Sequence, residues 1–360
     1  MRVPRQVAIV LLGAALAASA AACGGSSGGP APAPPPPAAG AAPAELPPAP
    51  EPAVAPPPTL PPTGKVAPVG SAVEGVVVDG PTRTAVAAVR DRRLALLDAD
   101  TGALRTTVSV GGTARHLQLA QPGGPVLVPG EDTDLLVQIG LPRGEVVAST
   151  RVGRQPHDAA YDPASKRVVV ADELAGSTTF VQDGQAVATL PGPVQPGGLA
   201  VADGRAGVVD VRGRTLFVYD MAAAKEIARL PAGDGPTHAV PLGKDRLLVA
   251  DTRGNALLVY SLGPMPREIG RLPQPGSPYG LAVDPARGAA YVALSATNQV
   301  LRFRITPDAG PDDPGLTQVG APLPTVQQPN SIGVDPRNGR LFIGSSAAAG
   351  DVQITAPPAG

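Results

Sequence analysis

Residues 278–285 read PYGLAVDP, and this pattern decides the fold because it returns along the chain. Residues 156–163 read PHDAAYDP and residues 329–336 read PNSIGVDP, so the copies share an initial proline, an apolar run and an Asp-Pro turn. Weaker copies complete a set of seven, whose first positions are 72, 114, 156, 196, 236, 278 and 329. A repeat of about 40 residues is typical of propellers and other repeat architectures.

Each copy contains four short runs that suit β-strands. In the copy that begins at Pro278 these runs are residues 280–283, 289–294, 298–305 and 316–322, with Asp, Pro and Gly gathered where the chain must reverse. Four short antiparallel strands per repeat are typical of a propeller blade. The sequence therefore predicts an all-β fold, a seven-bladed β-propeller of four-stranded antiparallel blades over residues 65–360. The absence of Trp excludes the WD-repeat version of the pattern.

The last copy lacks a fourth strand of its own. Its runs at 331–334, 341–344 and 351–355 leave only five further residues, two of them proline. Residues 64–70 precede the first copy and have the right phase to supply the missing strand. We expect this segment to complete the seventh blade, because an open ring would leave strand edges exposed.

The repeats resemble those of a known family. The pattern from Pro278 to the Tyr-Val-Ala at 291–293 is similar to that of YVTN-type, YncE-like propellers, which overlap in pattern with NHL propellers. The resemblance covers essentially all of residues 65–360 and implies the propeller fold. It implies no single reaction, since the family includes lactonase-like proteins, lyases and many members of unassigned role.

Composition and charge limit the kinds of partner and of core that we expect. The 360 residues carry a formal net charge of −1 and no long basic run, which argues against nucleic acid as a partner. Aromatic residues make up 2% of the chain, so we expect Val, Leu, Ile and Ala to fill the core.

The N-terminus predicts export and a lipid anchor. Residues 1–22 have a positive start at Arg2 and Arg5 and then an apolar run, as a bacterial signal peptide does. Cys23 is the only cysteine, and residues 20–24 (AAACG) resemble a lipoprotein box, although Ala20 stands where that pattern usually has Leu. We expect Cys23 to be lipidated and to hold the protein on the extracytoplasmic face of a bacterial membrane. Ordinary cleavage that leaves a free thiol is the alternative.

A proline-rich segment separates Cys23 from the repeats. Between positions 30 and 62, 16 of 33 residues are proline and most others are alanine. Such a composition cannot form a core and favours an extended polyproline II conformation, about 100 Å long over this stretch. We expect residues 23–64 to be a disordered Pro/Ala-rich linker that acts as a spacer.

Candidate binding residues share one phase of the repeat. The three histidines lie one or two positions after the start of a copy, where the innermost strand begins, and other copies place a different polar side chain there. Acidic residues end the second strand of three copies, on the same predicted face: Asp172 with Glu173, Asp210 and Asp251. The candidate channel-mouth residues are Glu74, His116, His157, Asp172, Asp210, His238, Asp251, Tyr279 and Asn330. They could bind a divalent metal or a polar ligand, or only bond to neighbouring loops and water.

Two classes of function follow. The first is a lipid-anchored extracytoplasmic binding module or assembly platform, with a protein or small-molecule ligand at the propeller face; no catalytic motif points to an enzyme. The alternative is a metal-dependent, lactonase-like hydrolase or lyase with its site at the channel mouth. A quinone-dependent dehydrogenase is disfavoured, because such sites usually stack the cofactor on Trp.

Overall fold

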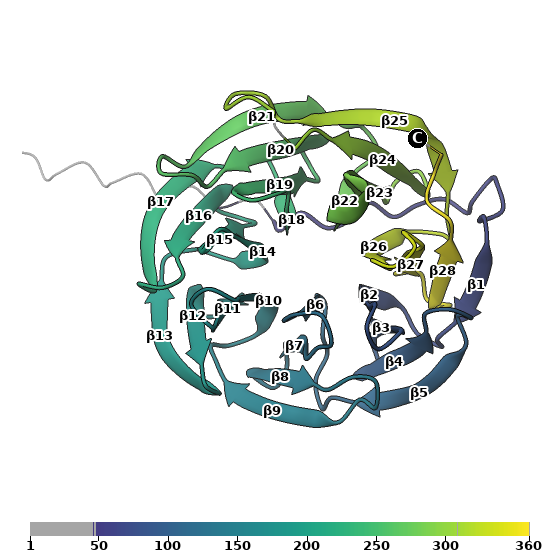
Figure 1. Ribbon diagram of the computed structural model, residues 1–360, viewed down its shortest axis with the longest axis horizontal. Coiled ribbons are helices and arrows are strands. Elements are labelled where there is room, and N and C mark those ends of the chain that lie inside the picture. The colour runs from purple at the N-terminus through teal and green to yellow at the C-terminus, as the bar shows by residue number, and fades with distance from the viewer. Residues whose placement is uncertain (1–45, 47, 308, 360) are drawn as a thin grey trace, which may run out of the picture. The chain divides into compact units, whose positions relative to one another are not determined.

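The computed structural model describes residue 46 and residues 48–307 and 309–359. These residues form the predicted fold, a ring of seven four-stranded antiparallel sheets (Figure 1). The predicted signal peptide, Cys23 and the part of the predicted linker formed by residues 24–45 and 47 lie outside the described residues. Within the described part of the chain, no helix is long and apolar enough to cross a membrane.

Each blade is built from strands in chain order, the innermost first. Blade 1 comprises β2 (Val73–Asp79), β3 (Thr84–Val89), β4 (Arg93–Asp98) and β5 (Leu104–Ser109). Blade 2 comprises β6 (Gln118–Leu119), β7 (Val126–Gly130), β8 (Leu135–Ile139) and β9 (Val146–Arg151). Blade 3 comprises β10 (Pro156–Asp162), β11 (Arg167–Asp172), β12 (Ser177–Gln182) and β13 (Gln185–Pro191). Blade 4 comprises β14 (Pro196–Ala202), β15 (Arg205–Asp210), β16 (Thr215–Asp220) and β17 (Lys225–Pro231). Blade 5 comprises β18 (Pro236–Pro241), β19 (Arg246–Asp251), β20 (Ala256–Ser261) and β21 (Arg267–Pro273). Blade 6 comprises β22 (Pro278–Asp284), the 3₁₀ turn η1 (Pro285–Arg287), β23 (Ala289–Leu294), β24 (Gln299–Ile305) and β25 (Leu316–Pro324).

Blade 7 closes the ring as the sequence predicts. It comprises β26 (Pro329–Val334), β27 (Leu341–Ser345), β28 (Asp351–Thr355) and, as its outermost strand, β1 (Lys65–Pro68). Lys65 lies opposite Ile354 and Pro68 opposite Asp351 in an antiparallel pair. The two ends of the repeat array are thereby joined in one sheet, and blade 7 has four strands like the other blades.

The core lies between neighbouring blades and is aliphatic. Val, Leu and Ala side chains of adjacent sheets form continuous buried clusters, for example between blades 5 and 6 and between blades 7 and 1. The second and third strands are almost wholly buried, whereas outermost strands such as β5 are exposed along most of their length. Small side chains fill the wedge between sheets, as the low aromatic content predicts.

Part of the predicted linker packs on the ring instead of extending away from it. Residues 48–58, here called the strap, cross one face of the ring before the chain reaches β1 (Figure 1). Pro50 and Ala55 are buried against the blades. The extended, proline-rich backbone expected of a free spacer also suits a segment that lies across a surface, because side chains of the ring can hydrogen-bond to its backbone polar groups.

Candidate functional site

One backbone hydrogen bond recurs in all seven blades and gathers the functional side chains. The residue that follows the second strand donates its N–H to a carbonyl just before the innermost strand. In six blades the acceptor directly precedes that strand, and in blade 2 it stands a few residues earlier. The donors are Arg90, Glu131, Glu173, Val211, Thr252, Ser295 and Ser346, and the acceptors are Ala72, Thr113, Gln155, Gln195, Gly235, Ser277 and Gln328. Second-strand exits therefore lie beside innermost-strand entrances on one face, here called the mouth, which the strap crosses.

The predicted acidic residues at the second-strand ends serve turns and do not join the mouth cluster. Asp172 accepts hydrogen bonds from Thr179 Oγ1 at 2.6 Å and from the Gly153 amide at 3.0 Å, and burial raises its pKa to about 6. Asp210 and Asp251 likewise accept from backbone amides, at 2.7 Å from Val194 and Gly235 respectively. All three carboxylates hold the loop that leads into the innermost strand of their own blade.

The residue after each of these positions faces the mouth instead. Successive side chains of a strand point to opposite sides, so a shift of one residue moves the functional group from the turn to the mouth. Glu131 and Glu173 occupy this following position in blades 2 and 3, and Arg90 occupies it in blade 1. Glu173 was noted beside Asp172 in the sequence, whereas Arg90 and Glu131 were not among the predicted site residues, although their polar character at a shared repeat phase was visible there.

A buried charge network surrounds His157. Its Nδ1 lies 3.0 Å from Glu173 Oε2 and 3.3 Å from Glu131 Oε1, and Arg115 Nε lies 3.1 Å from the same Glu131 oxygen. Burial lowers the pKa of His157, but its ion pair with Glu131 and its hydrogen bond with Glu173 outweigh burial and raise the pKa to about 9. Burial raises the pKa of Glu173, and its bond with His157 overcomes this and lowers it to about 2. Two cations and two anions thus alternate in one cluster.

The other two histidines lie in an aromatic cluster next to this network. The rings of His116 and His238 stack at 4.3 Å between centroids, and Tyr279 meets His238 edge-on at 4.3 Å. His157 approaches His116 edge-on at 4.6 Å. Burial and the neighbouring histidines hold the pKa of His238 well below its ordinary value, so its ring is neutral. His116 Nδ1 lies 3.1 Å from Asp158 Oδ2, a carboxylate that was not among the predicted site residues.

Glu74 and Asn330 form a third group at the mouth. Arg90 Nε donates to Glu74 Oε1 at 2.5 Å, and Asn330 Nδ2 donates to Glu74 Oε2 at 3.0 Å. Of the nine predicted residues, the structure therefore brings six together at the mouth: Glu74, His116, His157, His238, Tyr279 and Asn330.

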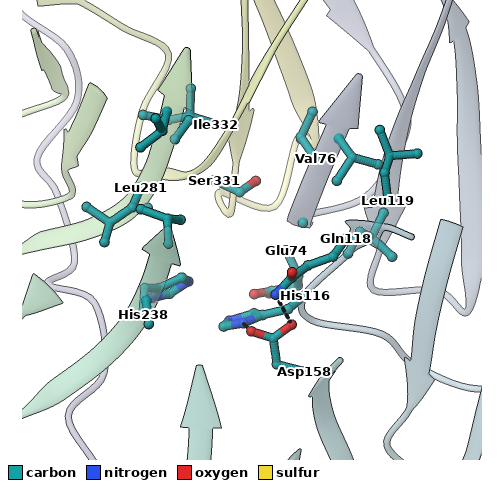
Figure 2. Close-up of a pocket in the computed structure, with 18 of the residues that line it drawn as sticks. Glu74, Val76, His116, Gln118, Leu119, Asp158, His238, Leu281, Ser331 and Ile332 are labelled. Atoms are coloured by element: carbon teal, nitrogen blue, oxygen red, sulfur yellow. Dashed lines mark hydrogen bonds and ion pairs between the residues drawn. The ribbon is translucent and has the colours of Figure 1, made fainter. Parts of the chain in front are cut away.

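Behind the mouth the innermost strands enclose a cavity of about 330 Å³. Figure 2 shows Glu74, His116, Asp158 and His238 together at one end of it, and Val76, Leu119, Leu281 and Ile332 along the rest. No lysine or arginine among the described residues lines this cavity. Polar groups at one end and apolar walls elsewhere are typical of small-molecule sites.

The strap covers the mouth over these groups. Pro50 and Glu51 line one small hollow with His157, Glu173 and Tyr279, and Glu51 and Pro52 line another, of about 140 Å³, with Glu74 and Asn330. Glu51 Oε2 lies 4.0 Å from Arg115 Nη1. The close approach of the strap depends on Gly235, where a Cβ would lie 2.9 Å from Pro50 Cβ.

One group at the mouth has donor atoms suited to a metal. The ligand atoms of Glu131, His157 and Glu173 all lie within 4.8 Å of one another. An imidazole nitrogen with two carboxylates suits Zn²⁺ or Mn²⁺. In the structure, the His157 proton and Arg115 already neutralise these two carboxylates, so a metal would have to displace the proton.

Comparison with known proteins identifies the fold and no family. No family model and no curated protein sequence matches the chain. The structure of U3-55K aligns over 82% of this chain and 99% of that one, with a TM-score of 0.68 and 12% identity. The crystal structure of the RRP9 WD40 repeats covers the same shares with a TM-score of 0.69 and 12% identity. Kuenenia stuttgartiensis hydrazine synthase covers 82% and 97%, with a TM-score of 0.66 and 13% identity. At such identities the likeness is one of fold alone.

The raised pKa of His157 makes stability depend on pH. Because the folded-state pKa of about 9 exceeds the ordinary 6.5, the contribution of His157 is complete below about pH 6.5 and is lost as the pH rises through 9. We expect the free energy of unfolding of the wild type to fall by about 3 kcal/mol between pH 6 and 10 relative to His157→Gln. Urea unfolding at a series of pH values measures this difference.

His238→Gln is the matched control for this measurement. His238 is neutral throughout the same pH range, so this variant should keep the wild-type slope. Parallel profiles for the wild type and His157→Gln would contradict the charge network.

Proposed function

We propose that this protein is a non-catalytic binding module or assembly platform of the YVTN type, held on the extracytoplasmic face of a bacterial membrane. The observation that supports it is the pairing of the ionisable groups at the mouth. His157 is held between Glu131 and Glu173, Glu74 between Arg90 and Asn330, and His116 against Asp158. Groups paired in this way fix the shape and charge of a surface, whereas an acid–base catalyst needs a group that is free to exchange its proton with substrate.

The fold and the repeat pattern favour the same reading. The YVTN-like pattern from Pro278 to Ala293 falls on β22 and β23, the two innermost strands of blade 6. A chain of a mitotic checkpoint complex shares the fold, with a TM-score of 0.68 and 10% identity, so propellers of this shape occur within protein assemblies. A protein or small-molecule ligand at the propeller face agrees with both observations.

Lipid on Cys23 would supply the membrane attachment. Metabolic labelling with a clickable fatty acid tests it: we expect label on the wild type and none on Cys23→Ser, because the thiol is the acylation site. The Cys23→Ser variant should also leave the membrane fraction. Equal labelling of the two proteins would overturn the anchor.

A metal-dependent hydrolase or lyase is the alternative function, and the Glu131, His157 and Glu173 group favours it. A metal there would polarise a carbonyl or activate water, and these three side chains would hold it. Two observations argue against a metal site. The strap covers the three side chains, and Arg115 already forms an ion pair with Glu131.

Metal-dependent turnover separates the two functions. The full chain is stripped with a chelator, reloaded with Zn²⁺ or Mn²⁺ and assayed on a panel of lactones and esters, with His157→Gln as the control. We expect no metal-dependent hydrolysis and no difference between the two proteins, because the histidine already holds a proton between two carboxylates. Hydrolysis that needs metal and is lost in His157→Gln would establish the enzyme instead.

A further inference from the structure

The strap is held mainly through its backbone. Arg253 Nη2 donates to the Pro48 carbonyl at 2.5 Å, Gln327 Nε2 to the Ala55 carbonyl at 2.9 Å, and Asn298 Nδ2 to the Pro56 carbonyl at 2.8 Å. The Ala53 amide donates to Ser277 Oγ at 3.3 Å and to Ser295 Oγ at 3.2 Å. Side chains of blades 5 and 6 and of the loops that follow them thus contact four backbone polar groups of one extended peptide.

The strap's own side chains contribute little specificity beyond small size and one charge. Val54 is 86% exposed, whereas Pro50 and Ala55 are buried in the surface below. Six of the eleven residues 48–58 are proline, which keeps the segment extended at low entropic cost and removes N–H groups that the surface would leave unpaired. Glu51 adds an acidic group near Arg115.

This surface has the features of a peptide-recognition groove. It offers side-chain donors, from Arg253, Asn298 and Gln327, to carbonyl groups, and hydroxyl acceptors, from Ser277 and Ser295, to one amide. Such contacts read an extended backbone and tolerate many small side chains. The donors and acceptors come from the ring itself and do not depend on which molecule supplies the peptide.

We propose that the mouth face is a binding groove for an extended, proline-rich peptide with an acidic residue, and that the strap is its resident ligand. The partner is such a segment on another protein, which must displace the strap to bind. Because the strap is tethered next to the groove, its effective concentration is on the order of millimolar, so it outcompetes weak ligands. The proposal names the partner class of the binding module and rests on that function.

Binding of the strap peptide in trans tests the groove. The probe is a fluorescein-labelled synthetic peptide of residues 46–60, and the receptor is the full chain as Cys23→Ser with residues 48–58 deleted. We expect fluorescence anisotropy to show saturable binding to the deletion variant and at least tenfold weaker binding to the parent chain, where the strap competes. A peptide with an N-methyl group on the Ala53 nitrogen lacks the donated N–H and should bind about fivefold more weakly.

A conservative double variant identifies the groove. Asn298→Asp and Gln327→Glu keep the shape of each side chain but replace the amide donor that meets the strap by a carboxylate, which cannot donate and repels the carbonyl oxygen. The Oδ1 at position 298 can still accept from the Gln328 amide. In the deletion background this variant should lose peptide binding while its melting curve stays unchanged. The proposal would be overturned if the double variant bound the peptide as tightly as the deletion variant does. It would also be overturned if the parent chain bound the peptide as tightly as the deletion variant does.

A second measurement applies if the deletion variant does not fold. In the otherwise intact chain, hydrogen exchange at the Ala53 amide should be at least tenfold faster in Asn298→Asp/Gln327→Glu than in the parent, because the strap leaves the groove more often. Unchanged exchange would overturn the proposal. If these tests fail while the hydrolase assays remain negative, the proposal of a peptide partner is wrong. The proposed function as a binding module is then unaffected.

Discussion

The backbone hydrogen bond that follows each second strand is the constraint on which the mouth depends. It joins the exit of that strand to the entrance of the innermost strand in all seven blades. Because side chains alternate along a strand, this bond determines which residue serves the turn and which faces the mouth. Asp172 and Glu173 are neighbours in sequence, yet the first accepts from Gly153 and Thr179 and the second pairs with His157.

Closure of the ring places the strap. With β1 paired to β28, the chain before Lys65 must leave from the outer edge of blade 7, and residues 48–58 then cross the mouth face. The groups beneath the strap neutralise one another: Arg115 and His157 carry positive charge, and Glu131 and Glu173 carry negative charge. The mouth is therefore a structured, charge-balanced surface with a cover, and the proposed binding function rests on this property.

The repeat predicted the fold and its closure from sequence, because both depend on periodicity and turn residues. The histidines, Glu74, Tyr279 and Asn330 were placed at the mouth for the same reason. The carboxylates were misplaced by one residue, because composition does not reveal which of two neighbouring residues faces the mouth at the end of the second strand. A bulge at the start of the innermost strand in six of the seven blades, as between Pro156 and Asp158, adds to this difficulty by shifting the register of the paired strands. The strap was missed because proline predicts an extended backbone but not the surface on which it lies.

The protonation states of the histidines test the central claim, that the charges at the mouth are already paired, most directly. The chain has only three histidines, so ¹H–¹⁵N correlation spectra of the imidazole nitrogens resolve each one through single His→Gln variants. The account predicts that His157 keeps a proton on both nitrogens until the pH approaches about 9, while His238 is neutral at pH 6. Titration of His157 near its ordinary value of about 6.5 would contradict it.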